Sequence, residues 1–248
     1  MTTQISTLIF VLFTIMSAGC LRIHNSNQSP TFLAETSIKS IPTPENVEVL
    51  GSAAQFAVLA GSTITNAGKT KVVGSIGVSP GTAIAGTPVE LVDGEIHSAD
   101  PISLKAQNDL ITAYNNLFNH IGSINITGKD LGGLTLAPGV YKFNSSAALT
   151  SGTLTLDGQN QPNAKWIFQM GSTFFAGIDT KVVMKNGGSA LNVYWQVGSS
   201  ATILSNAEMC GSIIAYASIT LGSNAHLTGR ALARVGAVTL VSNVVSMK

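Results

Sequence analysis

The sequence predicts a mainly β fold of the solenoid type, in which the chain winds in coils built from three short strands. Near the C-terminus a similar five-residue block occurs three times, at residues 202–206, 220–224 and 239–243. The period is thus 18 to 19 residues. A period of this length, carried by β-branched residues and interrupted by Gly and Ser-Asn pairs, is typical of one solenoid coil. Stacked coils lie about 4.7–4.9 Å apart. We therefore expect one corner to carry a ladder of Asn206, Asn224 and Asn243.

A second, longer repeat precedes this one. Tyr141, Phe168 and Trp195 lie at equal intervals, each inside an apolar or alternating run of about five residues, as expected for strands with a buried face. The wider interval predicts coils with extra loop residues, at about 157–164 and 185–189. We therefore expect at least five coils between residue 133 and the C-terminus.

The composition excludes several classes of function. The chain has 248 residues, a formal net charge of +1 and only 10% charged residues, against about a quarter in ordinary domains. Because there is no basic cluster, nucleic acid and anionic membrane surfaces are poor partners. Beyond residue 131 the acidic residues are Asp157, Asp179 and Glu208, which leaves that half of the chain with few general acids and bases.

The N-terminus predicts export. An apolar run at residues 8–16 is followed by three small residues, where the core and cleavage site of a signal peptide belong. The run is too short to span a bilayer, and no other run approaches the required length. We therefore expect a signal peptide over residues 1–19, a flexible Pro-containing leader over 20–46, a folded domain over 47–248, and a secreted, extracellular protein without a membrane span.

One helix interrupts the β pattern. Asp100 is suited to cap its N-terminus and Pro101 to occupy its first position, and Gly122 is suited to end it. The helix is expected over residues 101–121, with an apolar stripe packed on the flank of the solenoid. The stripe consists of Ala106, Leu110, Ala113, Leu117 and Ile121.

These pieces, in this order, resemble the microbial ice-binding (antifreeze) protein family. The matching segments are residues 50–60, 74–80, 133–141, 166–169, 195–197 and 229–240, which together span most of the chain. The resemblance implies a right-handed, discontinuous β-solenoid with a long α-helix packed alongside. It also implies secretion, ice as the partner, and no catalysis. We expect a monomer that inhibits ice growth and recrystallisation.

Members of that family bind ice through one flat β face of small Thr, Ser and Ala residues. If Ile64, Phe174, Ile203, Ile219 and Val238 point inward, their neighbours on the same strands point outward. Phe175 departs from the small-residue pattern, as do Tyr216 and Val235 near other strands. The predicted ice-binding residues are Thr63, Thr65, Ser146, Ala148, Thr173, Ser200, Thr202, Ser218, Thr220, Ala237 and Thr239.

No signal for a cofactor, a metal site or a catalytic group accompanies this face. The four His residues have no ligand spacing, no Gly-x-Ser-x-Gly elbow occurs, and Cys210 is expected to be a small buried hydrophobe. Two alternatives stay open. One is an extracellular adhesion or matrix solenoid without ice activity. The other is a polysaccharide-active β-helix enzyme, which would need carboxylates in one groove; its candidates are Asp93, Glu95, Asp157 and Asp179.

Overall fold

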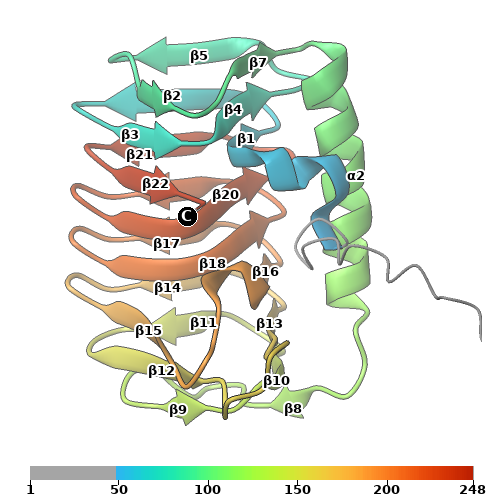
Figure 1. The fold of residues 1–248 in the computed structure, drawn as a ribbon, viewed down its shortest axis with the longest axis vertical. Helices are drawn as coiled ribbons and strands as arrows, with labels where there is room; N and C mark the ends of the chain where they lie inside the picture. The colour runs from blue at the N-terminus through green and yellow to red at the C-terminus, as the bar shows by residue number, and fades with distance from the viewer. Residues whose placement is uncertain (1–48, 248) are drawn as a thin grey trace, which may run out of the picture. The chain divides into compact units, whose positions relative to one another are not determined.

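The computed structural model describes residues 49–247, in which parallel strands stack as the coils of a solenoid with a long helix along one side (Figure 1). The prediction of a mainly β solenoid with a flanking helix is confirmed. Five coils lie between residue 133 and the C-terminus, as expected. The predicted signal peptide over residues 1–19 and the leader over 20–46 lie outside the described residues.

One face of the solenoid is a sheet of seven short parallel strands. Each coil contributes one strand of three to five residues, and the burial of the side chains alternates along most of them. In spatial order the strands are β11 (Ala147–Leu149), β14 (Phe174–Ala176), β17 (Ala201–Ile203), β19 (Ile219–Leu221), β21 (Val238–Val241), β2 (Thr63–Ala67) and β5 (Ala83–Gly86).

The remaining strands form a fifteen-stranded sheet that folds into the other two faces. The helix-side face contains β8 (Ile124–Asn125), β10 (Gly139–Phe143), β13 (Trp166–Met170), β16 (Val193–Val197), the ends of β18 (Glu208–Ala215) and β20 (His226–Ala233), β1 (Phe56–Ala60), β4 (Ser75–Val78) and β7 (Ile96–Ser98). The third face contains β9 (Thr135–Leu136), β12 (Thr153–Asp157), β15 (Lys181–Lys185), the starts of β18 and β20, β22 (Val244–Ser246), β3 (Lys71–Val73) and β6 (Glu90–Val92).

The long strands β18 and β20 turn the corner between these two faces at a pair of glycines. Gly211 pairs with Gly229, and both have a positive φ, of 103° and 152°. A Cβ atom on Gly229 would lie 1.9 Å from the carbonyl oxygen of Gly211. Only glycine fits where two backbones approach so closely at a bend.

The solenoid is discontinuous, because its N-terminal coils stack on the C-terminal end of the repeat. β1 pairs with β20, β2 with β21, and β3 with β22, all in parallel. The chain then leaves this end through α2 (Pro101–Phe118), which runs along the stack to the opposite end, where β8 begins the remaining coils (Figure 1). Helix and sheet bury a core of their own, which includes Phe56, Leu110 and Ile214.

The start of the helix agrees with the prediction, but its end does not. Asp100 caps the N-terminus by accepting a hydrogen bond from the Ser103 amide, with Pro101 in the first turn. The helix ends at Phe118 rather than at about residue 121, and the Gln169 side chain of β13 donates to its last carbonyl groups. Ile121, predicted to belong to the buried stripe, is 86% exposed.

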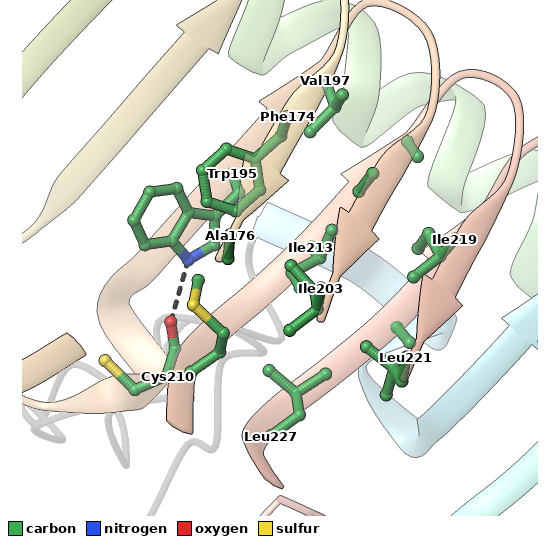
Figure 2. Packing of buried hydrophobic residues seen from close by; sticks show 14 of the residues in the cluster. Phe174, Ala176, Trp195, Val197, Ile203, Cys210, Ile213, Ile219, Leu221 and Leu227 are labelled. Carbon is green, nitrogen blue, oxygen red and sulfur yellow. Dashed lines mark hydrogen bonds between the residues drawn. The ribbon is translucent and has the colours of Figure 1, made fainter. Parts of the chain in front are cut away.

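The interior of the solenoid is packed in layers, one for each coil. Tyr141, Phe168 and Trp195 stack on one another, with centroid distances of 5.6 and 4.1 Å between successive rings. Figure 2 shows the Trp195 indole N–H donating to the Cys210 carbonyl oxygen, at 2.8 Å. The extra residues of the wider coils form loops at the corner that follows the third face, one between β12 and β13 and one between β15 and β16. The second loop contains the short 3-10 helix η2 (Ala190–Asn192). A further 3-10 helix, η1 (Gly51–Gln55), precedes β1 and packs on α2.

The predicted ladder of three Asn residues is wrong in its third member. Asn206 and Asn224 occupy an exposed corner in the left-handed conformation, each with φ 59°. In the next coil Ser242 takes that conformation, and Asn243 turns inward, where it is 1% exposed. Its side chain donates to the carbonyl groups of Gly222 and Ala225, so it binds the previous coil through the backbone.

Candidate functional site

The outward side of the seven-stranded sheet carries a central row with one residue from each coil. Strand pairing aligns these residues in register, so successive side chains stand one strand spacing apart, about 4.7–4.9 Å. The two neighbours of each row member on the same strand point into the interior, except at the edge strand β5, where burial is incomplete. In spatial order the row is Ala148, Phe175, Thr202, Thr220, Thr239, Thr65 and Ala85.

A second row runs parallel to the first, two residues earlier on each coil. It consists of Ser146, Thr173, Ser200, Ser218, Ala237, Thr63 and Ala83. All eleven predicted residues therefore lie on one face of one sheet. The five residues predicted to point inward beneath them are each no more than 1% exposed, which confirms the alternation on which the prediction rests; they are Ile64, Phe174, Ile203, Ile219 and Val238.

The hydroxyl groups of the two rows differ in their hydrogen bonds. In the second row, Ser200 Oγ accepts from the Ser218 amide at 3.3 Å, and Ser218 Oγ accepts from the Ala237 amide at 3.2 Å. Thr173 donates to Ser146 Oγ at 2.8 Å. In the central row no partner for the hydroxyls of Thr65, Thr202, Thr220 and Thr239 is found among residues 49–247. These four hydroxyls are available to water.

Charged side chains are confined to other parts of the solenoid. Neither row contains one, whereas the third face carries ion pairs between neighbouring coils, Lys71 with Glu90 at 3.2 Å and Lys181 with Glu208 at 2.7 Å. Ionic groups hold water strongly and in orientations of their own. Their absence leaves a surface of methyl and hydroxyl groups on a rigid sheet.

The face contains two residues that the sequence analysis did not predict. The structure also locates the three large residues that depart from the small-residue pattern. Ala83 and Ala85 flank Ile84 on β5, in register with Thr63 and Thr65. Their alternation around an apolar residue was the available signal, but neither carries a hydroxyl group. Phe175 lies within the central row and is 36% exposed. Tyr216 and Val235 lie at the corner beside the face; Tyr216 and Tyr114 of α2 both contact the Arg234 guanidinium.

The carboxylates considered for an enzyme do not share a groove. Asp93 and Glu95 follow β6 at one end of the stack, whereas Asp157 ends β12 towards the other. Asp157 accepts a hydrogen bond from Asn186, and Asp179, after β14, accepts one from Asn206. Asp157 and Asp179 are thus each close to a neutral side-chain amide.

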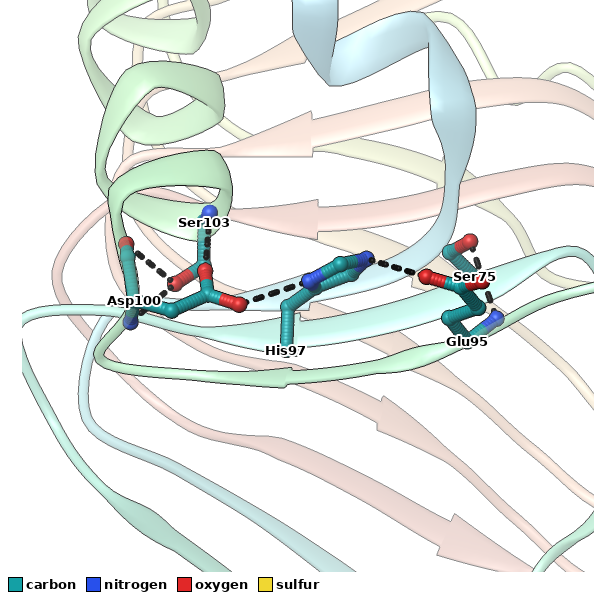
Figure 3. A network of polar contacts seen from close by, with 5 residues as sticks. All are labelled: Ser75, Glu95, His97, Asp100 and Ser103. Atoms are coloured by element: carbon teal, nitrogen blue, oxygen red, sulfur yellow. Dashed lines mark hydrogen bonds and ion pairs between the residues drawn. The ribbon is translucent and has the colours of Figure 1, made fainter.

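A cluster of polar side chains surrounds the start of the helix (Figure 3). His97 Nδ1 lies 2.7 Å from Asp100 Oδ2, and its Nε2 lies 3.8 Å from Glu95 Oε2. The backbone hydrogen bond from Ser103, followed by the contact with His97, lowers the pKa of Asp100 to about 2. Asp100 therefore stays ionised, as an N-cap should. Among residues 49–247 no group of three or more His, Cys, Asp or Glu is arranged to hold a metal ion.

Cys210 is packed as predicted. It is 5% exposed, its Sγ lies 3.4 Å from the sulfur of Met184, and burial raises the pKa of its thiol to about 12. A thiol in this state is a small apolar side chain rather than a nucleophile.

No helix within residues 49–247 is long and apolar enough to cross a membrane.

Comparison with known proteins identifies the family. Residues 58–246 match the model of the ice-binding-like family. An ice-binding protein of Nostoc sp. (strain HG1) is 45% identical over 215 residues, which cover 86% of this chain and 79% of that protein.

Two solved structures share the fold. The ice-binding protein from an Antarctic biological consortium has a TM-score of 0.77 and 44% identity, and the match covers 79% of this chain and 89% of that one. The protein from the ascomycete Antarctomyces psychrotrophicus has a TM-score of 0.77 and 36% identity, covering 80% and 97%. The family match, the sequence relative and both structures agree that this chain belongs to the ice-binding-like family.

Proposed function

We propose that this protein adsorbs to ice through the outward face of its seven-stranded sheet, and thereby inhibits ice growth and recrystallisation. The observation that carries the proposal is the run of Thr202, Thr220, Thr239 and Thr65 in adjacent coils, in register and with hydroxyls that have no partner among residues 49–247. Family membership supports ice as the partner.

Adsorption of this kind depends on many weak contacts acting together. A single van der Waals contact contributes only ~0.1–0.2 kcal/mol, so binding requires that a whole row meets the crystal at once. Parallel pairing fixes the height and spacing of the row. Methyl groups and hydroxyls can then hold ordered water between the protein and the ice lattice at little entropic cost.

The proposed activity consumes no cofactor and involves no covalent chemistry. We also propose that the protein acts as a secreted monomer after removal of residues 1–19, with residues 20–46 as a leader to a domain at 47–248. The mass of the protein recovered from the medium of an expressing culture would then correspond to a chain that begins near Cys20. Recovery of the intact chain inside the cells alone would contradict this part.

The direct test compares Thr220→Tyr with Thr155→Tyr in assays of ice recrystallisation inhibition and crystal shaping. Thr220 lies in the middle of the central row, whereas Thr155 points outward from β12 on the third face. Both substitutions place a large ring on a half-buried strand threonine. We expect Thr220→Tyr to weaken the inhibition strongly and Thr155→Tyr to leave it unchanged, with circular dichroism unchanged in both.

The alternative of an adhesion or matrix solenoid makes a different prediction. A folded wild-type protein that neither shapes ice nor slows recrystallisation would contradict the proposal and favour that alternative. If instead Thr155→Tyr were the damaging change, ice binding would stand but would belong to the third face.

A further inference from the structure

Phe175 interrupts the central row at an asymmetric position. It stands between Ala148 and Thr202, and its side chain is 36% exposed. A phenyl ring is much larger than the methyl and hydroxyl groups beside it. A flat crystal surface that rests on the threonines therefore meets this ring before it reaches Ala148.

The part of the row beyond Phe175 is level over five coils. Thr202, Thr220, Thr239, Thr65 and Ala85 follow one another in register, and four strand spacings give this part a length of about 19 Å. On the other side of the ring the described residues add only one small side chain, Ala148, and the next residue in register with it is the acidic Asp130. Small side chains thus form one long level segment and one isolated position.

The level segment also carries the free hydroxyl groups of the central row. Every threonine hydroxyl in the level segment lacks a protein partner within the described part of the chain. Beside the isolated position, Thr173 and Ser146 of the second row are bonded to each other. In the second row of the level part, Ser200 and Ser218 accept backbone N–H groups of the following coil, which fixes the spacing of neighbouring strands.

We propose that contact with ice is confined to the level segment from Thr202 to Ala85, and that Phe175 is its boundary. Ala85, which carries no hydroxyl group and lies on the edge strand β5, is then a contact residue, whereas Ala148 is not. This inference rests on the proposed function, because it assigns an extent to the same face. The surface that contacts ice is then shorter than the seven-stranded sheet.

The test uses two equal substitutions at opposite ends of the row, Ala85→Tyr and Ala148→Tyr, and measures thermal hysteresis at matched concentrations. A loss of ~1 kcal/mol, which marks an important interface residue, corresponds to about a fivefold loss of affinity. We expect a loss of that size for Ala85→Tyr and a clearly smaller one for Ala148→Tyr. Equal losses, or a larger loss for Ala148→Tyr, would overturn the boundary.

Phe175→Thr provides the second measurement. It joins Ala148 to the level segment, so thermal hysteresis should rise above that of the wild type, with an unchanged melting temperature as the control for folding. A fall in activity in a folded variant would overturn the proposal by making the ring itself a contact.

Thr220→Tyr, measured in parallel, separates this inference from the proposed function. A Thr220→Tyr variant with full activity means that the face itself is wrongly assigned. Loss of activity in Thr220→Tyr together with equal losses in the two alanine variants means that the face is right and only the boundary is wrong.

Discussion

Asn243 lies where the C-terminal and N-terminal parts of the solenoid meet, and replacement of its side chain, which binds the preceding coil, gives a sharp prediction. Asn243 follows β21, whose Thr239 stands next to Thr65 of β2 across the discontinuity. Its backbone N–H donates to Thr70 Oγ1 in the N-terminal part, at 3.1 Å. The side chain is 1% exposed and binds the preceding coil.

The magnitude follows from the bonds that Asn243→Ala removes. Asn243 Oδ1 accepts from the Val241 amide at 2.5 Å, and Nδ2 donates to the Gly222 and Ala225 carbonyl oxygens at 2.7 and 3.2 Å. Both carbonyls keep a backbone donor, so the main loss is the three bonds themselves. At about 1 kcal/mol net for each bond, the free energy of unfolding should fall by about 3 kcal/mol.

Urea denaturation followed by circular dichroism measures this loss. The urea concentration at the midpoint of unfolding should fall, while the dependence of the unfolding free energy on urea concentration stays the same. Asn224→Gly is the matched control, because Asn224 is an exposed corner residue with φ 59°, a conformation that glycine adopts freely. It should change the stability by less than ~0.5 kcal/mol. A loss below ~1 kcal/mol for Asn243→Ala would refute the role of this side chain in holding the preceding coil.

Two further predictions concern the thiol and the acid limit of stability. In a Cys20→Ser background, Cys210 should react with an aromatic disulfide reagent only after unfolding, because burial raises its pKa to about 12; rapid reaction of the native protein at pH 8 would contradict this. Burial opposes ionisation of Asp109, but hydrogen bonds from Lys105 and Ser52 outweigh it and lower the pKa to about 2, below the unfolded value of 3.8. Its contribution is therefore present above about pH 4 and lost as the pH falls through 2, so the melting temperatures of wild type and Asp109→Asn should differ at pH 7 and converge near pH 2. A gap of constant size across that range would contradict the assignment.

The features that follow from local pattern could be predicted from the sequence. Alternation around Ile64, Ile219 and Val238 gives the outward residues, because side chains on a strand alternate between its two faces. The start of the helix was equally accessible, because Asp100 and Pro101 act on residues adjacent in sequence.

The features that were missed depend on contacts between distant residues. Gln169, 51 residues after Phe118, caps the last carbonyl groups of the helix, and no local pattern reports such a contact. Asn243 leaves the predicted corner because it finds partners in another coil. Ala85 was missed because its place on the face follows from pairing between β2 and β5, whereas its local alternation around Ile84 does not say which strand it joins.

The most direct test of ice adsorption through the central row is partition of the protein into slowly growing ice. A single ice crystal is grown from a dilute solution of wild type or Thr220→Tyr, and the fraction of protein in the ice is compared with that in the remaining liquid. The account predicts enrichment of the wild type in the ice and exclusion of most of the folded Thr220→Tyr variant. Equal enrichment of the two proteins, or exclusion of both, would contradict it.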